Sequence, residues 1–293
     1  MERIEIQKTY KLYIGGQFPR TESGRYYTLT DKKGKVLANI CQGSRKDFRN
    51  AVVAARGAFA GWSGRNAYNR SQVLYRIAEM LEGRRSQFEA ELILQGETIF
   101  AAKKEISLAI DRLVYYAGWC DKYMQVFSSV NPVQSSHFNF SLPEPSGVVA
   151  IVAPQESGFA GLISAIAPVI AGGNCCVALA SEKKPLSAIS FAEVLATSDL
   201  PGGVVNILTG NTKELLTHMA SHMDVNALVY CGKNKDEIKL ARETAANNVK
   251  RVFVYDKNWN DPAEQNPYYI LDTQEIKTTW HPVENIGTSG AKY

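Results

Sequence analysis

The second half of the chain alternates between short apolar segments and helical segments. The apolar segments are hydrophobic on both faces, which is typical of strands buried in a parallel sheet. They are Gly147–Ala153, Cys175–Ala180, Val204–Leu208, Ala227–Tyr230 and Arg251–Tyr255, with helical segments at Phe159–Ala171, Leu186–Thr197, Lys213–Ala220 and Lys235–Ala246 between them. This alternation predicts right-handed crossovers and one doubly wound parallel sheet, so the expected fold class is α/β.

The first half has mainly helical periodicity. Ser44 is positioned as an N-cap with Asp47 in capping-box position, and apolar residues at helical spacing follow as far as Trp62. A second helical stretch, which is one amphipathic helix or a pair broken near Gly83, and a third long one complete this layer. They are Asn66–Leu94 and Glu97–Phe127. A short strand and turn, Lys11–Gly16, and a second strand, Val36–Cys41, precede the helices.

Two segments do not belong to this alternation. Gln134–Phe140 alternates polar and apolar residues, and Tyr268–Trp280 is rich in threonine and aromatic residues without a helical period. Both patterns predict strands at an exposed edge. The polar, proline-containing segment Asp256–Pro267 is expected to be a loop.

Composition limits the class of protein. The chain has 293 residues, 45% of them hydrophobic, and a formal net charge of +4, so a large core is expected and a basic nucleic-acid-binding stripe is not. No apolar run approaches the roughly 20 residues that span a bilayer. The start lacks the features of a signal peptide, and five cysteines form an odd set. We therefore expect a cytoplasmic protein without membrane or nucleic-acid partners.

The candidate binding site lies at the carboxyl ends of the predicted strands, where ligands of such sheets bind. The segments at this edge are Ala153–Gln155, Ala180–Glu182, Leu208–Gly210 and Cys231–Lys233. No G-x-G-x-x-G follows a predicted strand and no Walker motif is present. His218 and His222 lack the glutamate of a zinc-protease motif, so no metal site is expected. Cys231 is a weak nucleophile candidate, because only Lys233 provides an electropositive neighbour.

Several strings resemble the aldehyde dehydrogenase superfamily, in matching order and spacing from about Lys11 to Tyr255. They are Gly15-Gly16, Ala58-Phe59-Ala60-Gly61-Trp62, Tyr115-Tyr116-Ala117-Gly118-Trp119, Glu144-Pro145-Ser146-Gly147-Val148-Val149, Ala171-Gly172-Gly173-Asn174 and Leu200-Pro201-Gly202-Gly203-Val204-Val205-Asn206-Ile207. The last string is the most specific. The resemblance implies an open sheet that binds NAD(P) without a G-x-G-x-x-G motif. It assigns cofactor-binding positions to Ala153, Pro154, Glu182, Gly210, Gly232 and Lys233.

The chain departs from the family pattern where the chemistry would occur. Glu156 stands where the family has an asparagine that stabilises the oxyanion, and Tyr255 stands in the position of the catalytic glutamate. Leu179 replaces the lysine that contacts the adenosine ribose. A carboxylate repels a developing oxyanion, and losing one donor alone typically costs about 100- to 1,000-fold in rate. We therefore expect no ordinary aldehyde oxidation and weak or absent NAD(P) binding.

The resemblance also implies a domain organisation. Residues 1–130 and 144–256 correspond to the nucleotide-binding-type domain, and residues 131–143 and 266–283 correspond to oligomerisation strands. Only a short loop separates these strands from Tyr255, so the catalytic domain, with its cysteine segment, is expected to be missing. This organisation resembles the carboxyl-terminal, catalytically incomplete unit of family-16 type aldehyde dehydrogenases.

Three hypotheses follow. The first is a non-catalytic subunit that assembles as a homodimer or with a full-length aldehyde dehydrogenase. The second is an NAD(P)-dependent oxidoreductase that uses an unorthodox set drawn from Glu156, Tyr255 and Cys231. The third is a dinucleotide-binding or sensing module.

Overall fold

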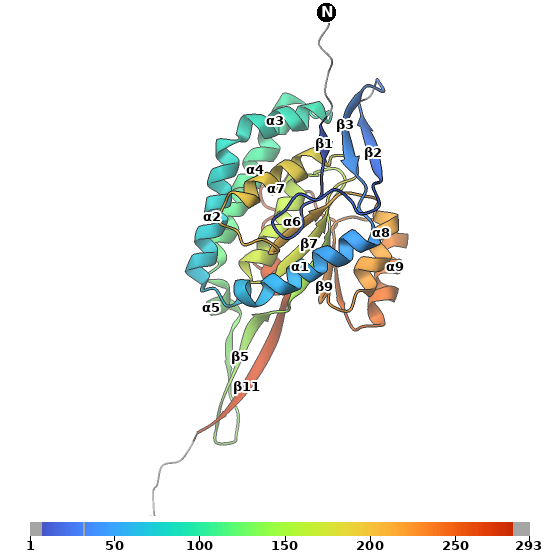
Figure 1. The fold of residues 1–293 in the computed structure, drawn as a ribbon. Helices are drawn as coiled ribbons and strands as arrows, with labels where there is room; N and C mark the ends of the chain where they lie inside the picture. The colour runs from blue at the N-terminus through green and yellow to red at the C-terminus, as the bar shows by residue number, and fades with distance from the viewer. Residues whose placement is uncertain (1–7, 32, 284–293) are drawn as a thin grey trace, which may run out of the picture.

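The centre of the molecule is a five-stranded parallel sheet (Figure 1). The computed structural model describes residues 8–31 and 33–283. The strand order is β10-β9-β6-β7-β8. The bounds are β6 Val148–Val152, β7 Cys175–Leu179, β8 Val205–Leu208, β9 Ala227–Tyr230 and β10 Arg251–Val254. Strands β6 and β7 are buried along their whole length, as expected for strands covered on both faces. The predicted α/β class with an open parallel sheet is confirmed.

Helices cover both faces of this sheet (Figure 1). One face is covered by α1 (Arg45–Ser63), α8 (Thr212–Ser221) and α9 (Lys235–Ala246). The other face is covered by α6 (Ala160–Ala171) and α7 (Leu186–Ala196), and outside these lie α2 (Ala67–Gly83), α3 (Arg85–Leu94) and α4 (Ile99–Trp119). All twelve residues of α6 are buried, because this helix lies between the sheet and the outer helical layer.

Two small sheets complete the fold. One has the order β1-β3-β2, from β1 (Thr9–Tyr10), β2 (Tyr26–Thr30) and β3 (Val36–Cys41). The other, which we call the arm, has the order β11-β5-β4, from β4 (Ser129–Asn131), β5 (His137–Pro145) and β11 (Gln274–Pro282). Figure 1 shows β5 and β11 projecting away from the body of the molecule. The short helices α5 (Tyr123–Phe127) and α10 (Tyr268–Leu271) lie near the base of the arm.

Several local predictions are confirmed. Ser44 caps α1 in a capping box with Asp47, which is why the helix begins at Arg45. The predicted break near Gly83 separates α2 from α3. The third helical stretch is also interrupted, into α4 and α5.

Two strand predictions are only partly correct. In Lys11–Gly16 the predicted turn lies at Gly15 and Gly16, whose φ angles are +62° and +83°, but in place of a regular strand only isolated bridges form, from Tyr13 to Ile207 and from Ile14 to Gln17. The strand expected over Tyr268–Trp280 begins only at Gln274. Before it, Tyr268–Leu271 form α10, whose first N–H is accepted by the Asn266 side chain at 2.9 Å. Residues 1–7 of the predicted 1–130 segment lie outside the described residues.

Candidate functional site

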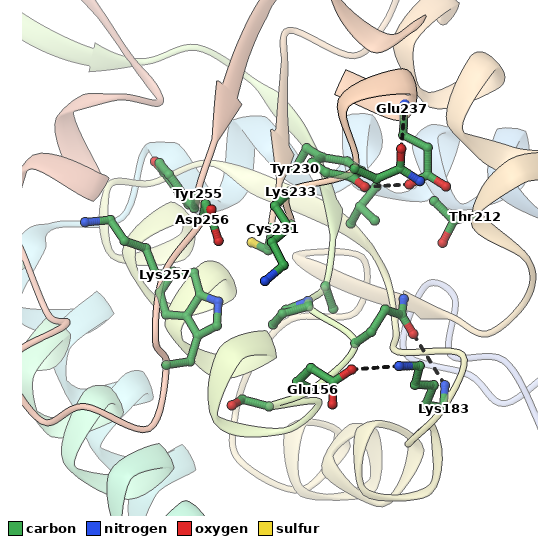
Figure 2. A pocket seen from close by; sticks show the side chains of 18 of the residues that line it. Glu156, Lys183, Thr212, Tyr230, Cys231, Lys233, Glu237, Tyr255, Asp256 and Lys257 are labelled. Carbon is green, nitrogen blue, oxygen red and sulfur yellow. Dashed lines mark hydrogen bonds and ion pairs between the residues drawn. The ribbon is translucent and has the colours of Figure 1, made fainter. Parts of the chain in front are cut away.

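A cavity of about 550 Å³ lies beyond the carboxyl ends of β6, β9 and β10 (Figure 2). In sequence, β6 is followed by β7 on one side of it, and the later strand β9 lies on the other side. The strand order therefore reverses at β6. Such a switch point leaves a crevice between diverging loops, which is the usual ligand site of open α/β sheets.

The cavity brings together most of the residues predicted from the sequence. Its lining includes Ala153, Pro154, Glu156, Glu182, Cys231, Gly232, Lys233 and Tyr255. Gly210 does not line it. This residue follows β8, the outermost strand, and a Cβ added there would lie 3.1 Å from the amide nitrogen of Gly43. Of the four predicted edge segments, Leu208–Gly210 therefore contributes nothing to the cavity wall.

The loop after β6 is held by its own polar side chains. The Gln155 carboxamide oxygen accepts hydrogen bonds from the Ser181 hydroxyl at 3.2 Å and from the Glu182 amide at 3.0 Å. The Glu156 carboxylate pairs with Lys183 at 2.6 Å, and the Lys183 ammonium holds the pKa of this carboxyl below its usual value. Glu156 is therefore an ionised, paired acid at the rim of the cavity.

The Glu182 carboxylate already has a partner within the protein. One of its oxygens accepts a hydrogen bond from the Thr212 amide at 2.6 Å, at the start of α8. The Thr212 hydroxyl is buried, and no described residue is its hydrogen-bond partner. Leu179, in the position of the family's ribose-binding lysine, is buried in β7. This corner of the cavity therefore has one unused hydroxyl and a carboxylate that caps a helix.

The loop after β9 contributes a thiol, a cation and a hydrogen-bonded acid. Cys231 is buried, and burial raises the pKa of its thiol well above the usual value. Lys233 is exposed and makes no hydrogen bond or ion pair with the described residues; Figure 2 shows its ammonium group pointing into the open cavity. The Tyr230 hydroxyl donates to Glu237 at 2.5 Å. Asn234 accepts from the first amides of α9, so these N–H groups are already satisfied.

The segment after β10 closes the cavity with aromatic rings. The Tyr255 hydroxyl donates to the Asp272 carboxylate at 2.7 Å, just before the arm strand β11. The Tyr255 ring packs against Trp259 and Tyr269. Residues 256–267 were predicted only as a loop, and their contribution to the cavity wall was not predicted.

The same segment is anchored to the helical layer by buried polar groups. The Arg112 guanidinium donates to the Asp261 carbonyl and to the Ser164 hydroxyl, both at 2.6 Å. The Tyr116 hydroxyl donates to the Asn266 carbonyl at 3.2 Å. The connection between β10 and α10 is thus held in place by hydrogen bonds and forms one wall of the cavity. The available sequence signal was Arg112, an arginine among the apolar residues of a predicted helix, because a charge that becomes buried there requires partners.

The remaining candidate groups do not form a second site. All five cysteines are free and buried. Burial raises the pKa values of Cys175 and Cys176, which are not reactive thiols. Within residues 8–31 and 33–283, no cluster of histidine, cysteine, aspartate and glutamate side chains could hold a metal ion. In the same residues, no helix is long and apolar enough to cross a bilayer.

Comparison with known proteins identifies the family. The sequence pattern of the aldehyde dehydrogenase family matches residues 18–255, so the chain belongs to this family. It is 30% identical over 258 residues to cytosolic 10-formyltetrahydrofolate dehydrogenase of Mus musculus, covering 86% of this chain and 29% of that protein. It is 31% identical over 258 residues to the putative aldehyde dehydrogenase DhaS of Bacillus subtilis, covering 86% of this chain and 51% of that protein.

Solved structures agree with this assignment. The NAD+ complex of an aldehyde dehydrogenase from Bacillus cereus superposes with a TM-score of 0.80 at 25% identity, covering 84% of this chain and 50% of that one. The chain therefore spans about half the length of the aldehyde dehydrogenases that it matches.

The cavity residues fit a dinucleotide only in part. Lys233 and the Thr212 hydroxyl are available, whereas Leu179 supplies no ribose contact and Glu182 has one oxygen engaged. The other lysines of the wall are paired, Lys183 with Glu156 and Lys257 with Glu264. One free cation facing several carboxylates is a weak counterpart for a pyrophosphate.

Proposed function

We propose that this protein is a non-catalytic member of the aldehyde dehydrogenase family that acts as an assembly subunit and binds NAD(P) weakly or not at all. The observation that carries the proposal is the state of the three positions that the chemistry would need. Thioester-forming oxidation requires an accessible thiolate, a base and an oxyanion donor. Cys231 is buried, Tyr255 is bonded to Asp272, and Glu156 is an anion paired with Lys183.

The proposed domain organisation is consistent with this function. Only residues 255–273 lie between β10 and β11, and they form the cavity wall and α10. In the family that the chain resembles, a catalytic domain would enter at this point. We propose a nucleotide-binding-type domain over residues 1–130 and 144–256, oligomerisation strands over 131–143 and 266–283, and no catalytic domain, as in the incomplete unit of family-16 type relatives.

The arm supports the assembly role. The β11 strand pairs with β5 along nine residues, and eight of its nine residues are exposed. A strand edge without a partner is a template for β-augmentation. We propose that its partner is a second copy of the chain or a full-length aldehyde dehydrogenase, and that assembly occurs in the cytoplasm, where free cysteines remain reduced.

A panel of aldehydes with NAD or NADP tests the catalytic half of this proposal. We expect no change in nicotinamide absorbance, and the same result for Cys231→Ala and Glu156→Gln. Turnover that one of these substitutions abolishes would instead establish an oxidoreductase with a non-standard site. Co-purification with a full-length relative supports the assembly half, and a stable monomer that binds neither itself nor a relative contradicts it.

A dinucleotide-binding module is the second candidate function, favoured by the Thr212 hydroxyl and the Lys233 ammonium, which have no partner in the part of the chain that the structure describes. Calorimetric titration with NAD and NADP distinguishes it. Each lost charge-assisted hydrogen bond costs roughly 1.5–3 kcal/mol, about one to two decades of affinity, so we expect a dissociation constant near the millimolar range. Saturation well below millimolar ligand, lost in Lys233→Ala, would favour the binding module.

A further inference from the structure

The arm presents an open strand edge with large apolar side chains on it. Strand β11 has a neighbour only on the β5 side within the described residues. Its Ile276 and Trp280 side chains are 53% and 57% exposed, although both lie on a regular strand. Exposed edges are usually protected by charge, proline or shortness. On this edge the proline lies at the end, the charged Glu275 and Lys277 are already paired with Arg251 and Glu144, and two large apolar residues lie on one face. We therefore expect another strand to pair with this edge.

The usable part of this edge has defined ends. At its start, the Gln274 carbonyl accepts a hydrogen bond from Arg251 at 2.5 Å, and the Gln274 side chain is buried. At its end, Pro282 has no N–H to donate. The segment left for pairing is Glu275–His281, and its central residue is Thr278.

We infer that β11 pairs antiparallel with β11 of a second copy about a two-fold axis at Thr278, which rests on the proposed assembly function and names its partner. A two-fold axis makes the interface self-complementary, as in most homodimers. Thr278 then lies opposite Thr278 of the other copy, and Lys277 opposite Thr279. Ile276 lies opposite Trp280, twice by symmetry, so that each exposed apolar side chain gains an apolar neighbour.

The charges favour the same register. It places Glu275 opposite His281, while Glu275 keeps its ion pair with Arg251 at 2.7 Å. Lys277 is already paired with Glu144 of its own arm at 2.6 Å. No acidic side chain faces another acid, and the one lysine of the edge lies opposite a threonine.

Neighbouring registers are less favourable. An axis at Lys277 places two lysines directly opposite each other, which is destabilising. An axis at Thr279 places Lys277 opposite His281 and leaves Ile276 opposite a proline. Of these three registers, only the axis at Thr278 combines apolar with apolar and acid with base.

The shape of the molecule permits this contact. The arm projects from the body (Figure 1), so two antiparallel arms place the two bodies at opposite ends of the joined strands. The product is a six-stranded sheet with the order β4-β5-β11 followed by the same strands of the second copy in reverse. The pairing covers the longest open edge of each arm.

Single cysteines test the register. The five native cysteines are buried, so they add no background to mild oxidation. Thr278→Cys should form a disulfide-linked dimer, because directly opposite residues have Cβ atoms about 4.5–5.5 Å apart, close to the disulfide range. Glu275→Cys is the matched control and should not cross-link, since the two copies of residue 275 lie six positions, about 20 Å, apart. The double variant Glu275→Cys with His281→Cys should cross-link again.

A charge swap tests the interface without cysteines. Ile276→Lys alone and Trp280→Glu alone should each weaken dimerisation at least about tenfold, measured by light scattering over a concentration series. The double variant places lysine opposite glutamate and should restore the dimer. Circular dichroism should show each variant folded, because both side chains are exposed in the single chain.

Two results overturn the inference: a protein that is monomeric at all concentrations, or cross-linking through Glu275→Cys but not through Thr278→Cys. The proposed function fails separately. A monomer that nevertheless captures a full-length relative leaves the assembly role intact and removes only the self-pairing. A Thr278-centred dimer that oxidises aldehydes keeps the pairing and removes the non-catalytic function.

Discussion

The two ends of the central sheet differ in what their polar residues contact. At the amino ends of the strands, the buried Asn174 accepts from the Gly147 amide at 2.8 Å and donates to the Thr273 carbonyl at 2.9 Å. Asn206 similarly accepts from the Gly15 amide and donates to the Cys176 and Gly203 carbonyls. At the carboxyl ends there is a cavity, where the Thr212 hydroxyl and the Lys233 ammonium have no partner among residues 8–31 and 33–283.

The residues that hold the sheet together therefore lie at the end opposite to those that line the cavity. Asn174 and Asn206 belong to strings that resemble the family, and their side chains satisfy backbone groups of this sheet. The departures from the family pattern, Glu156 and Tyr255, lie at the opposite end around the cavity. The chain thus matches its family where the fold is held together and differs where a reaction would occur.

The largest expected effect is at the amino end. Asn174→Ala should lower the free energy of unfolding by about 3 kcal/mol, because it leaves the buried Gly147 amide unpaired and removes one of the hydrogen bonds of the Thr273 carbonyl, which Ser146 still contacts. Urea unfolding followed by circular dichroism measures this. Asn258→Ala, on an exposed loop at the carboxyl end, is the control and should change stability by less than about 0.5 kcal/mol. Equal effects of the two variants would contradict the contrast between the ends.

Close packing at the cavity floor gives the second prediction. A Cβ at Gly161 would lie 2.2 Å from the Pro154 ring and 3.0 Å from the Trp259 indole. Gly161→Ala should therefore destabilise the protein by about 2 kcal/mol. Gly57→Ala is the matched control, since a Cβ there has no neighbour within 4 Å, and it should stabilise α1 by about 1 kcal/mol. An unchanged free energy of unfolding in Gly161→Ala would show that the loop after β6 can move away from residue 161 at little cost.

Two buried threonines give a direct comparison of used and unused hydroxyls. The Thr209 hydroxyl donates to the Cys41 carbonyl at 2.6 Å, whereas the Thr212 hydroxyl has no partner among the described residues. Thr209→Val should cost about 1–2 kcal/mol, and Thr212→Val should cost nothing or stabilise slightly. Thermal unfolding of both variants measures the difference. A loss of stability in Thr212→Val would indicate an undetected partner for this hydroxyl.

The smallest expected effect is a pH dependence at the start of α6. Glu105 is buried and accepts from the Phe159 and Ala160 amides, both at 3.0 Å, and burial raises the pKa of its carboxyl above the usual 4.5. A raised pKa means that the folded state binds the proton more tightly. The contribution of Glu105 to stability is therefore full below pH 4.5 and is lost as the pH rises through the folded-state pKa.

Glu105→Gln isolates this contribution, because glutamine keeps the acceptor oxygen and does not titrate. Relative to the wild type, the variant should become more stable as the pH rises from 4.5 to 7, in urea unfolding at each pH. Glu79→Gln, on an exposed face of α2, is the control. A difference in the free energy of unfolding between wild type and Glu105→Gln that does not change with pH would contradict a raised pKa of Glu105.

Much of the fold could be predicted from the sequence. The five apolar strands, the helices between them and the Ser44 cap all depend on patterns within a few residues. The prediction that a strand begins at Tyr268 was wrong. Its aromatic residues favour a strand, but Asn266 and Pro267 start the short helix α10 there. The sequence predicted that the site lies at the carboxyl ends of the strands, whereas its position beside β6 follows from the strand order, which the structure shows.

The chain by itself determined which residues reach the carboxyl edge; only the tertiary structure decided what each of them can still do there. Glu182 is engaged by an amide 30 positions away, and Tyr255 by a carboxylate 17 positions away. Cys231 is inert because layers from distant parts of the chain bury it. Periodicity is a local property, whereas desolvation and hydrogen-bond partners depend on groups that meet only when the layers pack.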